Sequence, residues 1–201
     1  MLKVGLTGSI AVGKTFVCSV FRELGCFVLD ADLTAREVVM PGTIGLAEIV
    51  RNFGEGVLTD KGELDRAKLG SIVFADAAKL SLLNSIVHPL VFAVQDEWIR
   101  ARESEELAGI AIVDAALMIE SGGYKRFDKL IVVVCDPEVQ LQRLMARESM
   151  TKAEARKRIA AQMPQEEKKR YADFLIDTSN GFRDTRRQTI EIYQQLRLLN
   201  S

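Results

Sequence analysis

An eight-residue segment near the start of the chain constrains the fold more than any other feature. Its sequence, GSIAVGKT at 8–15, fits the pattern Gly-x-x-x-x-Gly-Lys-Thr and directly follows the apolar run at 2–7. Such a loop joins a buried strand to a helix, and its glycines let backbone N–H groups turn toward phosphate oxygens. Lys14 can then reach the β- and γ-phosphates, and the Thr15 hydroxyl can bind magnesium. The segment therefore predicts a nucleoside triphosphate site.

Four further short apolar runs alternate with segments of helical pattern. They lie at 26–30, 109–114, 130–135 and 174–177. Their continuous apolarity is typical of strands buried on both faces of a parallel sheet. Four of the five runs end in or just before an aspartate, and open α/β sheets bind ligands beyond the carboxyl ends of their strands. We expect an α/β fold with a five-stranded parallel sheet, flanking helices and carboxylates along one edge.

Two segments are too long to be simple connections. Roughly 75 residues separate the second and third runs, and apolar residues recur there at helical spacing, so an inserted helical lobe is expected at about 52–102. A proline-started helix and the capping box of Thr151 and Glu154 predict a helical hairpin at about 137–162. The segments at about 1–51, 103–136 and 163–201 would form the core of a single domain. Basic residues gather on the hairpin and just beyond it: Arg143, Arg147, Arg156, Arg158, Lys168, Lys169 and Arg170.

Composition argues against several classes of protein. Lys and Arg total 27 and Asp and Glu total 28, so no overall charge favours nucleic acid or an anionic membrane. The cysteines at 18, 26 and 135 lie in apolar stretches without C-x-x-C spacing, which indicates buried thiols in a reducing compartment. No uninterrupted apolar stretch approaches the roughly 18 residues of a membrane span. We expect a cytoplasmic protein without nucleic-acid or membrane partners; the sequence leaves its oligomeric state open, with a monomer favoured.

A polar segment, DADLTAR at 30–36, follows the second apolar run. Phosphoryl transfer to an alcohol needs a carboxylate that orients the hydroxyl and accepts its proton, and Asp30 and Asp32 are placed to meet such an acceptor. Either carboxylate could instead cap the helix that follows. Arg36 could hold an anionic part of the substrate.

In their order and spacing, these segments resemble the dephospho-coenzyme A kinase family over essentially the whole chain. The matching pieces are GLTGSIAVGKT, DADLTAREVVMPG, DKGELDRAKLGSIVF, LNSIVHPL, VDAALMIES, RLMARES, RIAAQMP and ADFLID. The resemblance implies ATP-dependent phosphorylation of the ribose 3′-hydroxyl of dephospho-coenzyme A. It also implies a P-loop sheet, an acceptor-binding lobe at about 52–102, an arginine-bearing lid at about 137–162, and magnesium as the metal.

The resemblance further implies catalytic roles for three residues. Asp32 falls on the proposed base of the family, and Arg147 on the lid arginine that closes over the ATP phosphates. Lys14 supports the transferring phosphoryl group. The implied ATP-binding residues are Gly8, Ala11, Val12, Gly13, Lys14, Thr15, Phe16 and Arg147.

Metal and substrate contacts are implied in the same way. Asp114 falls on the acidic position beside the phosphate loop that holds magnesium together with Thr15. Arg36, His88 and Glu120 fall on positions at the substrate. His88, the only histidine, is equally compatible with a structural role, and Glu120 with a solvated loop charge.

The sequence departs from the family pattern at several positions. Ala11, Val12 and Phe16 stand where the family usually has Gly, Ser and Thr, so their contacts with ATP would be mainly through the backbone. The run DTSNG at 177–181 differs from the usual Asp-Asn-x-Gly, and it leaves the adenine contacts unassigned.

Three alternatives remain at this stage. Another small-molecule or nucleotide kinase of the P-loop group would share the loop, the lid and the inserted lobe. A GTP-dependent switch generally needs D-x-x-G and N-K-x-D elements, and neither occurs in the 201 residues. A degenerate P-loop protein that only binds nucleotide is disfavoured because Lys14, Thr15, Asp32 and Arg147 are all retained.

Overall fold

The computed structural model describes residues 1–200; Ser201, the last residue of the predicted core, lies outside the described residues. The chain divides into two compact units. The first consists of Met1–Asp30 and the chain from Arg100 onward, and the second of Ala31–Ile99. The second unit begins earlier than the predicted lobe at 52–102 because Val39 and Ile49 share an apolar core with Leu69 and Val73. That this unit binds the acceptor stays a prediction.

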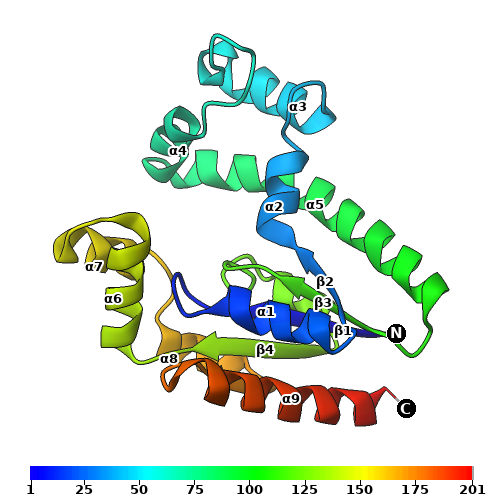
Figure 1. The fold of residues 1–201 in the computed structure, drawn as a ribbon. Coiled ribbons are helices and arrows are strands. Elements are labelled where there is room, and N and C mark those ends of the chain that lie inside the picture. The colour runs from blue at the N-terminus through cyan, green and yellow to red at the C-terminus, as the bar shows by residue number, and fades with distance from the viewer. Residues whose placement is uncertain (201) are drawn as a thin grey trace. The chain divides into compact units, whose positions relative to one another are not determined.

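A five-stranded sheet forms the centre of the first unit (Figure 1). Its strands are β1 Leu2–Thr7, β2 Phe27–Asp30, β3 Ile110–Asp114, β4 Lys129–Val134 and β5 Phe174–Asp177. They are ordered β2-β3-β1-β4-β5, and every neighbouring pair is parallel. The predicted α/β fold class is confirmed, and each strand lies within one residue of its predicted bounds.

Apolar residues on both faces explain why these runs form buried strands. Two helices, α1 Lys14–Glu23 and α9 Gly181–Leu199, pack against each other beside the sheet. Asp114 lies opposite Leu6 in β1 and opposite Asp30 in β2, so the carboxyl ends of these strands share one edge. The main apolar core comprises Val4, Leu6, Val12, Val17, Cys18, Phe21, Cys26, Ile110, Ile112, Ile131, Val133, Cys135, Ile176, Ile192 and Leu196.

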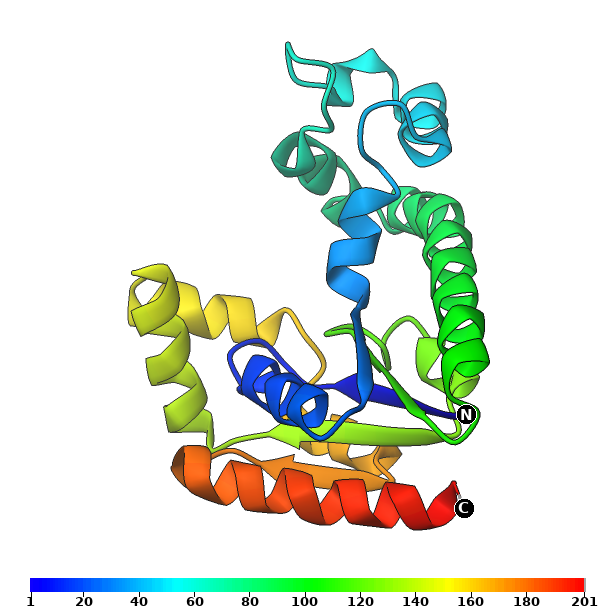
Figure 2. The same ribbon diagram turned by 45° about the vertical axis from the view of Figure 1, so that its right-hand side comes forward.

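The predicted hairpin is formed by α6 Pro137–Glu148 and α7 Lys152–Ala160, which project beside the phosphate loop (Figure 2). Asp136 caps α6 by accepting bonds from the N–H groups of Glu138 and Val139. The capping box of Thr151 and Glu154 is formed as predicted. Short elements complete the unit: η2 Gly123–Arg126 before β4, and α8 Gln165–Lys168 and η3 Lys169–Tyr171 before β5.

The second unit is helical. It contains α2 Ala31–Glu37, α3 Ile44–Phe53, η1 Glu55–Val57, α4 Arg66–Phe74 and most of α5 Ala77–Glu105. Within residues 1–200, α5 alone is long and apolar enough to cross a membrane by length and composition, which is weak evidence for a span. The expected absence of a membrane partner therefore stays a prediction.

Candidate active site

The phosphate loop runs from the end of β1 into α1, as the motif predicts. A Cβ on Gly8 would lie 2.4 Å from the carbonyl oxygen of Val133, so only glycine fits there. Gly13 begins α1 with a positive φ of 92°, and no side chain caps the helix. Its first N–H groups are therefore not bonded by a capping side chain, and the helix N-terminus favours an anion. Lys14 folds over the loop, where its Nζ donates to the carbonyl oxygen of Gly8 at 3.3 Å.

The side chains of the three loop residues that depart from the family pattern pack against other parts of the protein. Val12 is completely buried, and the ring of Phe16 packs on Phe182 with 4.7 Å between the centroids. Ala11 adopts a left-handed conformation with a φ of 61°, which is costly for a residue that has a Cβ. That these residues contact ATP through the backbone stays a prediction.

A clamp that the sequence did not reveal holds the loop to the segment after β5. The Thr178 hydroxyl donates to the carbonyl oxygen of Val12 at 2.7 Å, and this bond is buried. Arg143 on α6 donates to the Thr178 hydroxyl and carbonyl oxygens at 2.7 and 2.8 Å. One lid arginine is therefore engaged in positioning the loop.

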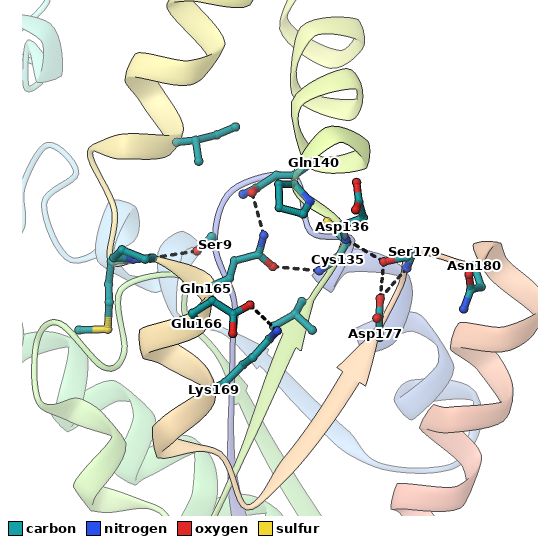
Figure 3. A pocket seen from close by; sticks show the side chains of 15 residues that line it. Ser9, Cys135, Asp136, Gln140, Gln165, Glu166, Lys169, Asp177, Ser179 and Asn180 are labelled. Atoms are coloured by element: carbon teal, nitrogen blue, oxygen red, sulfur yellow. Dashed lines mark hydrogen bonds and ion pairs between the residues drawn. The ribbon is translucent and has the colours of Figure 1, made fainter.

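Behind the loop, a pocket of about 560 Å³ opens at the carboxyl ends of β4 and β5 (Figure 3). It borders the loop at Ser9 and the lid at Gln140 and Ile159. Asp177 and Ser179, which belong to the departing DTSNG run, line it on the β5 side. This run is therefore exposed to a cavity beside the predicted nucleotide site.

Asp114 lies at the end of β3, in register with β1 just before the loop. Its Oδ2 accepts a hydrogen bond from the thiol of Cys18 at 3.5 Å. Burial, reinforced by the Asp114 charge, raises the pKa of this thiol, so Cys18 stays protonated. Within residues 1–200 no cluster of three or more His, Cys, Asp or Glu side chains could hold a metal alone. The exposed Thr15 and the Asp114 carboxylate offer hard oxygen ligands, which suit magnesium when phosphate and water oxygens complete its shell.

Glu120, predicted at the substrate, forms an ion pair within the first unit. Its carboxylate lies 2.9 Å from Nζ of Lys168, a side chain that is completely buried. Lys168 also donates to the carbonyl oxygen of Ala116 at 2.8 Å, and the N–H of Met163 donates to Glu120. Burial lowers the pKa of Lys168, and the Glu120 carboxylate partly offsets this. The geometry gives Glu120 a structural partner, and its substrate contact stays a prediction.

Arg147, the predicted lid arginine, lies at the end of α6 and is exposed. Its guanidinium forms an ion pair with the adjacent Glu148 at 3.0 Å, and Arg158 of α7 pairs with the other oxygen of Glu148 at 3.3 Å. Ion pairs this exposed are weak, so they leave Arg147 able to exchange Glu148 for a phosphate.

The remaining predicted residues belong to the second unit. Asp32 is exposed in the first turn of α2, and Arg36 is exposed in its last turn. Arg66 of α4, which sequence reasoning missed, donates to the carbonyl oxygen of Arg36 at 3.2 Å. Burial, and to a smaller extent the charge of Arg36, lowers the pKa of Arg66. His88 lies in the middle of α5 against the ring of Phe92, and burial lowers its pKa.

Comparison with known proteins identifies the family. The profile described as Dephospho-CoA kinase matches residues 2–184. The dephospho-CoA kinase of Streptomyces avermitilis is 45% identical over 199 residues, covering 98% of this chain and 94% of the relative. The chain belongs to the dephospho-CoA kinase family. The dephospho-CoA kinase of Geobacillus kaustophilus is 44% identical and covers 96% of each chain.

Solved structures agree with this assignment. The dephospho-CoA kinase from Campylobacter jejuni has a TM-score of 0.71 at 28% identity and covers 99% of this chain and 98% of that one. TT1252 from Thermus thermophilus has a TM-score of 0.85 at 29% identity, with 96% of each chain covered. Shikimate kinase from Acinetobacter baumannii, at 16% identity, a TM-score of 0.52 and coverage of 98% and 93%, shares the fold alone. The predicted family, the P-loop fold and the assignment as a kinase are confirmed.

Proposed function

We propose that this chain transfers the γ-phosphoryl group of ATP to the ribose 3′-hydroxyl of dephospho-coenzyme A, the last step of coenzyme A synthesis. Membership of the dephospho-CoA kinase family, with ATP as the phosphate donor, carries this proposal. The phosphate loop at 8–15 also supports it, because Gly13 and Lys14, which a nucleotide site needs, are both present.

On the ATP side, backbone N–H groups of the loop and of the first turn of α1 bind the phosphate oxygens. Lys14, already folded over the loop, reaches the β- and γ-phosphates. Arg147 leaves Glu148 and neutralises charge on the transferring group as the lid excludes water. Arg143 keeps the loop and Thr178 in place throughout.

Magnesium would be held by Thr15 and, directly or through water, by Asp114. Bound there, it would supply positive charge that lowers the cost of the negative charge developing during transfer. The oxygen ligands on either side of the loop favour this cation over softer metals.

On the acceptor side, Asp32 orients the 3′-hydroxyl and accepts its proton as the bond to phosphorus forms. Arg36 binds an anionic part of dephospho-coenzyme A, and His88 and Glu120 contribute contacts to the acceptor. Transfer is direct and in line, and ADP leaves without a covalent phospho-enzyme. We further propose a monomer that acts in the cytoplasm.

The decisive experiment is mass spectrometry of the acceptor after incubation with ATP, magnesium and dephospho-coenzyme A. Conversion to coenzyme A that is lost in Lys14→Ala supports the proposal. Asp32→Asn should keep near-normal ATP binding and lose turnover by about a hundredfold or more. Folded, ATP-binding protein that leaves dephospho-coenzyme A unchanged contradicts the assigned acceptor.

A further inference from the structure

Ile10, in the phosphate loop, is partly buried beside the lid. Its side chain packs against the apolar core that joins the two lid helices, together with the neighbouring Ala11. That core consists of Leu141, Leu144 and Ala155. The loop and the lid therefore share one packed interior.

The backbone of Ile10 is bound by both arms of the lid. Gln140 on α6 donates through Nε2 to the carbonyl oxygen of Ile10 at 2.7 Å. Gln162, just after α7, accepts through Oε1 from the N–H of Ile10, also at 2.7 Å. The hydroxyl of Ser9 adds a longer bond to the carbonyl oxygen of Met163, at 3.4 Å. The segments that enter and leave the lid thus both bind the backbone of one loop residue, Ile10.

A third glutamine fixes this arrangement to the sheet (Figure 3). Gln165 donates to Oε1 of Gln140 at 2.9 Å and accepts from the N–H of Cys135, just beyond β4, also at 2.9 Å. Both polar atoms of the Gln140 amide are engaged, and its residue is buried. A buried amide whose nitrogen and oxygen both have partners is held in one orientation and is costly to replace.

The backbone settles which atom each glutamine presents to Ile10. A carbonyl oxygen only accepts, so Gln140 must present its NH₂ group; an N–H only donates, so Gln162 must present its oxygen. Glutamate can therefore replace Gln162 without losing the bond. At position 140, glutamate would place a carboxylate oxygen against the carbonyl oxygen of Ile10, and both atoms are acceptors.

We propose that Gln140 and Gln162 are positioning residues that fix the phosphate loop at Ile10 and make its fit to ATP depend on the base of the lid. Ala11, the next residue, has its left-handed backbone between this anchor and the phosphate-facing turn at Gly13. Releasing Ile10 lets Ala11 relax and turns loop N–H groups away from the phosphates. The inference rests on the proposed role of the segment at 8–15 as the ATP site.

The test compares Gln140→Glu, Gln162→Glu and Gln162→Leu by titration calorimetry with ATP and by steady-state kinetics. Gln140→Glu and Gln162→Leu should raise the Kd and KM for ATP about tenfold, the effect of losing one hydrogen bond, with a smaller change in kcat. Gln162→Glu should stay within about twofold, because the acceptor is kept. Gln142→Glu, an exposed position on α6, is the control that adds the same charge without touching the loop.

Hydrogen exchange at the Ile10 amide gives a second readout that needs no ATP. Protection of the Ile10 amide from exchange should persist in Gln162→Glu and disappear in Gln162→Leu. These two variants test the inference even if Gln140→Glu does not fold. Equal ATP affinities for Gln162→Glu and Gln162→Leu would overturn the inference. Failure of the unaltered protein to bind ATP would instead refute the nucleotide site itself.

Discussion

The ion pair between the buried Lys168 and the partly exposed Glu120 leads to a quantitative prediction about stability. Lys168 is completely enclosed, whereas 24% of the Glu120 side chain is exposed. Removing the carboxylate in Glu120→Ala leaves the Lys168 ammonium without its charged partner and with only the carbonyl oxygen of Ala116 as an acceptor. Removing one partner of a fully buried pair costs about 3–5 kcal/mol, and the partial exposure of Glu120 lowers the expected loss to about 2–3 kcal/mol.

The reverse change should cost less. Lys168→Met fills similar volume with an apolar chain, and the remaining Glu120 carboxylate can turn toward water, so we expect a loss of about 1–2 kcal/mol. For a chain of this size, each kcal/mol shifts Tm by about 2–4 °C. Glu120→Ala should therefore lower Tm by about 4–12 °C, and Lys168→Met by about half as much.

Thermal and urea unfolding of both variants and of the double variant would measure these values. The double variant should be more stable than the sum of the single losses predicts, by about 1 kcal/mol or more. In Glu120→Ala the pKa of Lys168 should fall further below its usual 10.5. The unfolded state then binds the proton more tightly than the folded state, so the free energy of unfolding should rise with pH up to about 10.5. A larger loss in Lys168→Met than in Glu120→Ala would refute this reasoning.

Three further predictions concern the loop and the second unit. Gly8→Ala should destabilise the protein by about 2–3 kcal/mol, because its Cβ collides with the backbone of Val133; an unchanged urea midpoint would contradict this. On the proposal that Arg36 binds an anionic part of dephospho-coenzyme A, Arg66→Ala should raise the KM for that substrate about tenfold with little change in the KM for ATP, because Arg66 donates to the backbone of Arg36; equal shifts in both constants would count against it. Burial holds the pKa of His88 below 6.5, so the unfolded state takes up a proton first and the free energy of unfolding should fall as pH drops below 6.5. His88→Gln should remove this dependence; if Tm falls equally with pH in both proteins, the prediction is wrong.

Local patterns allowed much of this fold to be predicted. The strands were located within one residue because buried parallel strands are continuous apolar runs, and the phosphate loop because its glycines are dictated by backbone geometry. The start of α7 followed from the capping residues Thr151 and Glu154. Each of these signals lies within a few residues of the structure that it specifies.

Contacts between distant segments could not be predicted in this way. Nothing in the sequence sets Lys168 apart from the basic residues near it, yet its partner Glu120 lies 48 residues away in the chain. Gln140 and Gln162 resemble ordinary polar helix residues, and their partner Ile10 lies 130 and 152 residues away. No periodicity marks a side chain whose partner is a distant backbone group.

The buried cysteines give this protein a practical advantage for spectroscopy. Cys18, Cys26 and Cys135 are free thiols, and burial raises the pKa of all three, that of Cys26 to about 12. The thiolate is the form of cysteine that attacks thiol reagents, so the native cysteines react slowly at neutral pH. An introduced cysteine at the exposed Lys152 of the lid can therefore carry a fluorescent or spin label in an otherwise unaltered chain. Movements of the lid during turnover become measurable without first removing any native thiol.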